Sequence, residues 1–149
     1  MSLESKITIA LKEAMKNKNQ EALTALRSVK SVILLHKTQK SYSGELSQEE
    51  EMKILQKLVK QRKDSADIYN NEGRNDLAEP ELKEAEIIQK FLPKSLSVDE
   101  IKEIVKSVID EIGADGMKDM GKVMGVSTKK LMGKADGKTI STIVREFLS

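Results

Sequence analysis

The chain has 149 residues, of which 34% are charged and 3% aromatic, and its formal net charge is +2. That length suits one domain or two small ones with modest cores. A net charge this small does not identify a nucleic-acid binder, so only the distribution of charge can do so. The sequence contains no cysteine, which excludes a thiol nucleophile, disulfides and thiolate metal sites.

The N-terminal sequence MSLESKITIALKEAMKNK mixes acidic and basic residues into its apolar pattern. A secretory signal peptide has a different pattern, with an uninterrupted apolar stretch. The longest purely apolar run, Val32-Ile33-Leu34-Leu35, is far short of a membrane span. We therefore expect a cytoplasmic protein without a membrane partner.

Two apolar stripes predict the first two helices, on either side of a polar break at residues 17–19. Apolar side chains recur there at intervals of three and four residues, as on one face of a helix. The stripe positions are Ile7, Ala10, Leu11, Ala14 and Met15, then Leu23, Leu26, Val29 or Lys30, and Ile33. A Ser-rich joint around Gly44 follows the second helix.

The third predicted helix is the longest, over about 48–72. Ser47 and Glu50 have the spacing of a capping box, which starts a helix, and Gly73 marks its end. Arg62 falls on the core stripe, where an apolar residue is expected. We expect it to pair with a carboxylate of a neighbouring helix; the alternative is that its charged end reaches out to solvent.

A fourth helix is predicted before Pro93, with Asp76 as its cap. Its buried side is predicted at Leu82, Ala85, Ile88 and Leu92. A fresh capping box begins directly after residues 93–96, which are therefore predicted to be a linker. The linker separates an N-terminal helical domain, 1–92, from a C-terminal helical domain, 97–149.

The C-terminal domain is predicted to hold three helices. The first spans about 98–112, with Val98 at the start of its apolar stripe and Gly113 at its end. The last follows a cap at Asp136. No apolar–polar alternation is bracketed by hairpin turns. The predicted fold class is therefore all-α, with a multi-helical N-terminal part and a small three-helix C-terminal domain.

A glycine-rich segment lies between these two helices. Its fragment GKADGKT looks like a P-loop, but Met132 stands where that motif requires its first glycine, and no strand precedes it. ATP hydrolysis is therefore disfavoured. Gly121 and Gly125 are four residues apart, which would let one face of a short helix approach a neighbour closely.

The same segment is rich in lysine, and Asp136 is its only acid between residues 120 and 138. The candidate RNA-binding residues are Lys122, Lys129, Lys130, Lys134 and Lys138. Backbone amides at two predicted helix starts, Ser127 and Asp136, lie beside these lysines. Helix N-termini with nearby lysines can bind phosphate oxygens. The alternative is an ordinary solvated face.

Two segments, VKQRKDSADIYNNEGRNDLAEPELKEAEIIQKFLP and DMGKVMGVSTKKLMGKADGKTISTIV, resemble the bacterial YqeY proteins, and the resemblance extends over nearly the whole chain. It implies a two-part helical fold shared with the tail of GatB, the B subunit of the tRNA-dependent amidotransferase. Such tails are implicated in tRNA contact away from the chemistry. The resemblance makes tRNA a candidate partner, along with the amidotransferase itself or other translation proteins. The family label also includes carbon–nitrogen ligase activity with glutamine as amido-N-donor.

The chain has no counterpart of the catalytic portion of that enzyme. A nucleophile needs a base within reach, and the only histidine, His36, is expected to be a surface or packing residue of the second helix. We predict no catalytic residue, no cofactor and no metal site. The leading hypothesis is a non-catalytic helical module that binds tRNA. The alternatives are a protein–protein adaptor with a glycine–methionine docking face, and an amidotransferase-associated factor.

Overall fold

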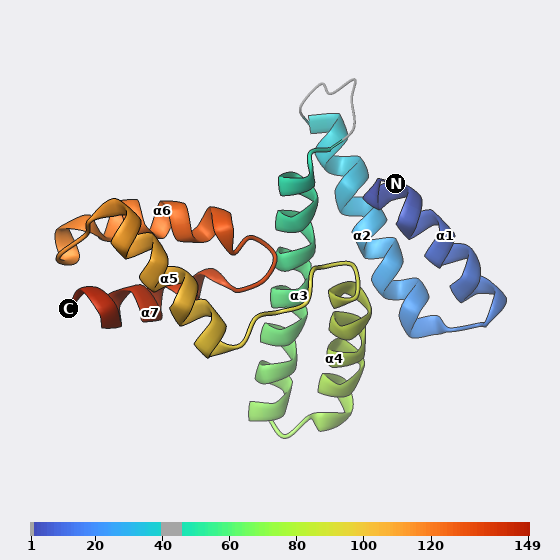
Figure 1. Ribbon diagram of the computed structural model, residues 1–149. Helices are drawn as coiled ribbons and strands as arrows, with labels where there is room; N and C mark the ends of the chain where they lie inside the picture. Colours follow the sequence, from blue (N-terminus) through green and yellow to red (C-terminus); the bar gives the residue numbers. More distant parts are fainter. Residues whose placement is uncertain (1, 40–45) are drawn as a thin grey trace. The chain divides into compact units, whose positions relative to one another are not determined.

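The computed structural model describes residues 2–39 and 46–149, which form two compact units, residues 1–92 and 93–149 (Figure 1). The described residues contain seven α-helices, one short 3-10 turn and no strand, so the all-α prediction is confirmed. The joint predicted around Gly44 lies outside the described residues.

Unit 1, residues 1–92, consists of four helices: α1 (Leu3–Lys16), α2 (Gln20–Gln39), α3 (Gln48–Asn71) and α4 (Asn75–Gln89). Helix α1 packs along α2, and α4 packs against both α3 and α2. The predicted capping box at the start of α3 is present, because the Ser47 hydroxyl accepts the Glu50 N–H and the Glu50 carboxylate accepts the Ser47 N–H.

The core of unit 1 lies where the apolar stripes predicted it in α1 and α2. Ile7, Val29 and Ile33 are fully buried. Two stripe positions differ, because Met15 on α1 and Leu82 on α4 are 54% and 41% exposed. Each of these side chains stands at the edge of its apolar stripe, where the neighbouring helix no longer covers it.

Arg62 joins three helices of unit 1. Its Nε lies 3.3 Å from Glu84 Oε2 on α4, and both side chains are less than 15% exposed. Its Nη2 donates a 2.8 Å hydrogen bond to Ser28 Oγ on α2, and Ser28 in turn donates to the Ala25 carbonyl oxygen. The predicted pairing of Arg62 with a neighbouring carboxylate is confirmed.

The ion pair does not fully offset the burial of its carboxylate. Burial raises the pKa of Glu84, and the Arg62 guanidinium lowers that pKa by a smaller amount. The charged form of Glu84 is therefore less stable in the fold than in water. Such a pair stabilises the fold less than its short distance suggests, but either charge left alone would be costly.

Replacing Arg62 alone with Met should lower the free energy of unfolding by about 2–3 kcal/mol, because Glu84 would stay buried without its partner. The double variant Arg62→Met/Glu84→Gln should recover most of that loss. Urea unfolding of both single variants and the double variant gives the coupling energy. Additive effects of the two single changes would contradict the assigned pair.

The turn before α4 differs from the prediction. Asp76 does not cap the helix: α4 begins at Asn75, its N-cap is Arg74, and no side chain caps it. Asp76 instead lies in the first turn and accepts two 3.1 Å hydrogen bonds from the Arg74 guanidinium, which holds its pKa below the ordinary value. This ion pair is exposed, so it contributes little to stability.

Unit 2, residues 93–149, consists of three helices and a 3-10 turn: α5 (Val98–Ile112), η1 (Met117–Asp119), α6 (Met120–Lys130) and α7 (Gly137–Leu148). The predicted capping box of α5 is present, formed by Ser97 and Glu100. Gly113 ends α5 with a φ of 73°, a left-handed conformation that favours glycine. Val98 is 53% exposed and does not belong to the core.

The three helices of unit 2 pack against one another around an apolar cluster. Val105, Val123 and Val144, from α5, α6 and α7, are each fully buried in it. Leu96 packs against the same cluster, and its N–H donates a 3.0 Å hydrogen bond to the Lys134 carbonyl oxygen. The chain just before α5 is therefore attached to the turn between α6 and α7.

Candidate nucleic-acid interface

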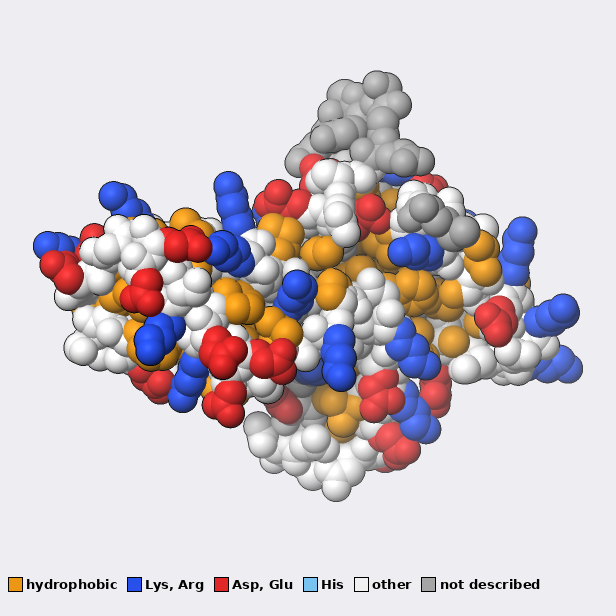
Figure 2. Space-filling view, viewed as in Figure 1, with side chains coloured by type: hydrophobic (Ala, Val, Ile, Leu, Met, Phe, Trp, Pro, Cys, Tyr) orange, Lys and Arg blue, Asp and Glu red, His pale blue; other side chains and the backbone are white. Residues whose placement is uncertain are grey.

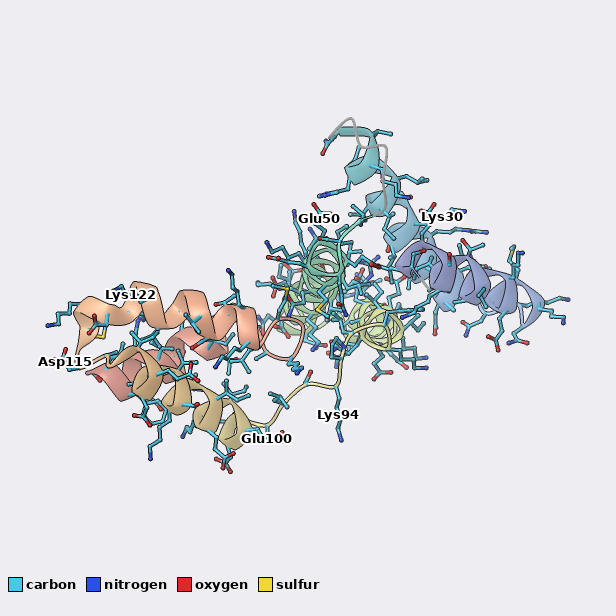
Figure 3. The ribbon with its side chains drawn as sticks, turned by 45° about the horizontal axis from the view of Figure 1, so that its top comes forward. Lys30, Glu50, Lys94, Glu100, Asp115 and Lys122 are labelled. Atoms are coloured by element: carbon cyan, nitrogen blue, oxygen red, sulfur yellow. The ribbon has the colours of Figure 1, made fainter. Side chains whose placement is uncertain are left out.

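The core of unit 2 sets the rotation of α6. Val123 and Ser127 are fully buried, and Leu131, directly after the helix, is buried with them. Residues three and four apart lie on one side of a helix. The opposite side therefore carries Lys122 and Lys129, both of which are exposed, and Figure 3 marks Lys122 on α6.

Gly121 and Gly125 form an open strip beside these two lysines, here called the glycine strip. A Cβ placed on either glycine would meet no atom within 4 Å. The prediction that these glycines let α6 approach a neighbouring helix is therefore wrong, because no described residue comes within 4 Å of a Cβ built on either one. Gly125 leaves the backbone of α6 uncovered between Lys122 and Lys129, and Gly121 does so just before Lys122.

The structure divides the five predicted lysines among four places. Lys122 and Lys129 share the outer face of α6. Lys130 points to α5, where its Nζ lies 3.2 Å from Glu111 Oε2. Lys134 lies in the turn after α6, and Lys138 lies in the first turn of α7.

All five side chains are exposed. Within residues 2–39 and 46–149, only Lys130 of these five forms an ion pair. The outer face of α6 therefore presents two free ammonium groups. Lys134, in the turn after α6, and Lys138, in the first turn of α7, present two more. In Figure 2, basic and acidic side chains are interspersed over the visible face of unit 2.

The two helix starts expected beside these lysines do not both exist. Ser127 lies inside α6 and is fully buried, so its amide is not at a helix start. Asp136 does cap α7, with its Oδ1 accepting the Thr139 N–H at 2.7 Å. That carboxylate already occupies an amide that an anion would use. Of the groups predicted to contact phosphate, the exposed lysines are therefore present on this surface, whereas the Ser127 helix start is not.

The Ser127 hydroxyl is buried without a hydrogen-bond partner among the described residues. A buried polar group in that state costs free energy. Ser127→Ala should therefore raise the free energy of unfolding by about 1 kcal/mol, measured by urea unfolding. Ser107→Ala, at an exposed position of α5, is the matched control and should change little. A loss of stability in Ser127→Ala would show that the hydroxyl has a partner.

His36 lies away from these lysines, on α2 of unit 1. Its Nε2 is 3.7 Å from Glu50 Oε1 on α3, and both side chains are partly buried. Within the described residues, no three His, Asp or Glu side chains converge as a metal site would require. None of the described helices combines the length and the apolar character that crossing a bilayer needs.

The described chain is an all-helical protein of two compact units, with two glycines in its penultimate helix. The sequence model described as "Yqey-like protein" matches residues 4–148. The chain therefore belongs to the family of YqeY-like proteins.

Three relatives show how far the similarity extends. "Altered inheritance of mitochondria protein 41, mitochondrial" of Clavispora lusitaniae is 41% identical over 117 residues, which cover 76% of this chain and 66% of that protein. The protein of the same name from Pyrenophora tritici-repentis is 29% identical over 142 residues, 93% of this chain and 76% of that protein. A glutamyl-tRNA(Gln) amidotransferase subunit of Thermococcus gammatolerans is 39% identical over 70 residues, 44% of this chain and 11% of that protein.

These relatives correct the expectation of a cytoplasmic protein. The fungal proteins are mitochondrial by name, which contradicts that expectation. That expectation followed from the absence of a signal-peptide pattern and of a membrane span. A compact helical fold can function in the cytoplasm or in mitochondria, so the fold does not decide between them. The match to the Thermococcus protein covers only a small part of it, as expected for a module shared with a larger protein.

Proposed function

We propose that this protein binds a folded RNA of the tRNA class through unit 2 and does not transform it. The outer face of α6 carries the proposal: Lys122 and Lys129 stand exposed and without ion pairs on either side of an uncovered stretch of backbone. The Thermococcus relative supports the choice of RNA, since its name assigns it to tRNA chemistry. The names of the fungal relatives make mitochondrial tRNA one of the RNAs to test.

Glycine in the middle of a helix costs about 1 kcal/mol relative to alanine. At Gly125 no close packing contact offsets this cost, because no described atom lies within 4 Å of the position that a Cβ would occupy. A ligand that packs directly on the helix backbone would account for this cost. A sugar-phosphate chain lying between Lys122 and Lys129 is such a ligand, since both ammonium groups could reach its phosphates.

The mode of recognition follows from the side chains present. Aromatic residues make up 3% of the chain, which leaves little capacity for base stacking. Lysines that contact phosphates give affinity but no base readout. The protein should therefore recognise the shape and charge of a folded RNA, and salt should weaken binding because phosphate contacts release counterions.

A role as a protein–protein adaptor has less support. That alternative requires methionines on the outer face of the glycine-rich segment. Met120 and Met124 instead pack against the core of unit 2, and only Met117, in η1, is close to half exposed. An association with an amidotransferase remains compatible with RNA binding, because the bound tRNA would be the shared ligand.

Neutralising the outer face of α6 should weaken RNA binding. Lys122→Gln/Lys129→Gln removes two charges and keeps good helix formers. The dissociation constant for a tRNA transcript should rise about tenfold near 0.1 M salt, and the slope of log K against log salt should shrink by about 1.5–2. Fluorescence anisotropy over a salt series measures both quantities.

The control is Lys102→Gln/Lys106→Gln, two lysines on α5 of the same unit. It changes the net charge equally, and its affinity should stay within about twofold of the parent. Equal losses in both double variants would show that RNA responds to total charge and not to this surface. An unchanged slope in Lys122→Gln/Lys129→Gln would reject the assigned face.

Gly125 tests the backbone approach separately. Gly125→Ala should raise the free energy of unfolding by about 1 kcal/mol, since the methyl group meets nothing in the fold. Gly125→Gln should keep the helix and weaken tRNA binding several-fold, because its side chain covers the strip. Unfolding curves and anisotropy are the two measurements. Full affinity in Gly125→Gln would mean that RNA does not pack on the strip.

A further inference from the structure

The charge of unit 1 is divided between its two halves. Residues 2–39 contain seven Lys or Arg and three Asp or Glu, whereas residues 46–92 contain eight and eleven. Helices α1 and α2 are therefore basic. In the other half, α3 carries five basic and five acidic residues, so the excess of acidic residues lies on α4. The net charge of the whole chain conceals this separation.

The positive charge gathers on α1 and on the turn after it. The α1 basic face is defined as Lys6, Lys12, Lys16 and Lys18, all of which are exposed. None of the four forms an ion pair within the residues that the structure describes. Of the two acids on α1, Glu4 is already paired with Lys37 of α2, which leaves Glu13 alone. In Figure 2, basic side chains project from the right-hand edge, where Figure 1 draws the end of α1 and its turn.

The turn that carries Lys18 is held by backbone hydrogen bonds. The Lys18 N–H donates to the Met15 carbonyl oxygen at 3.2 Å, and the Asn19 N–H donates to that of Ala14 at 3.0 Å. The Asn19 side chain accepts the Ala22 N–H at the start of α2. Lys18 is thus fixed beside the last turn of α1, and the cations do not have to be gathered before a ligand binds.

We propose that the α1 basic face is a second contact for the same RNA, made to its phosphate backbone. This inference rests on the proposed function. Lys12 and Lys16 are one helical turn apart, about 6 Å along the axis, which suits neighbouring phosphates of one strand. The face has no aromatic residue, so its contact carries charge and no base readout.

An anionic membrane is the other polyanion that a basic helix can meet, and α1 suits it poorly. An interfacial helix binds by placing its apolar face between lipid headgroups. The apolar face of α1, with Leu3, Ile7 and Leu11, is buried in the core of unit 1. Of the larger apolar side chains on α1, only Ile9 and Met15 are left exposed, each at 54%.

The test uses the full chain and a tRNA transcript in the same anisotropy assay. Lys12→Gln/Lys16→Gln should weaken binding about five- to tenfold near 0.1 M salt and reduce the salt slope by about 1.5–2. The variant that carries these two changes together with Lys122→Gln/Lys129→Gln should have a salt slope smaller by about 3–4. Lys53→Gln/Lys57→Gln, one turn apart on α3, where basic and acidic residues are equal in number, is the matched control and should leave the slope unchanged. Lys6→Gln/Lys18→Gln provides a second, independent variant should the first lose helicity by circular dichroism.

Each result separates the two proposals. An unchanged slope in Lys12→Gln/Lys16→Gln, with a reduced slope in Lys122→Gln/Lys129→Gln, would overturn this inference and leave the proposed function standing. The reverse pattern would remove the role of unit 2 and keep that of α1. The last measurement in this test is cosedimentation of the protein with phosphatidylserine vesicles. Binding of vesicles that depends on Lys12 and Lys16, with RNA affinity unaffected, would overturn the inference in favour of a membrane.

Discussion

Burial of one side of α6 is the constraint on which the candidate interface depends. Val123 and Ser127 must face the core of unit 2, and this fixes the rotation of the helix. Lys122, Gly125 and Lys129 are turned outward as a consequence. Three valines, one from each helix, supply much of the apolar contact, so the geometry of a polar surface is determined by apolar packing.

Unit 1 uses a different device to hold its helices. Arg62 reaches Glu84 and Ser28 from the middle of α3, and so connects α2, α3 and α4 through one side chain. A polar contact of this kind stabilises less than an apolar one of equal volume, but it accepts few alternative arrangements. It links the basic helix α2 to the acidic helix α4 through α3.

Helices and their caps were predictable from sequence because their signals are local. The boxes at Ser47 and Ser97, and the cap at Asp136, need only a few neighbouring residues. The sequence predictions were wrong at positions whose environment depends on how another helix packs. Ser127 resembles a helix start in sequence, yet α6 continues through it and its side chain is buried in unit 2. The outward direction of Gly125 likewise depends on which face of α6 the core selects.

The candidate site was predictable as a set of residues but not as a surface. Five lysines in one segment indicated a basic region, whereas their division among four places depends on the fold. Lys130, which is paired with Glu111, shows this clearly. The α1 basic face has no comparable signal in the sequence, because its lysines are spread over thirteen residues with Glu13 among them. Their common exposure, and the pairing of Glu4 with Lys37, are properties of the fold.

The hydrogen bond between Leu96 and Lys134 gives unit 2 a mechanical linkage. It joins the segment that precedes α5 to the turn that follows α6, although the two are far apart in sequence. A pull on the entering segment would be transmitted to the backbone of Lys134, while the ammonium group of that residue stays free in solvent. The backbone of one lysine in this turn is thereby held by a residue that lies outside every helix of unit 2.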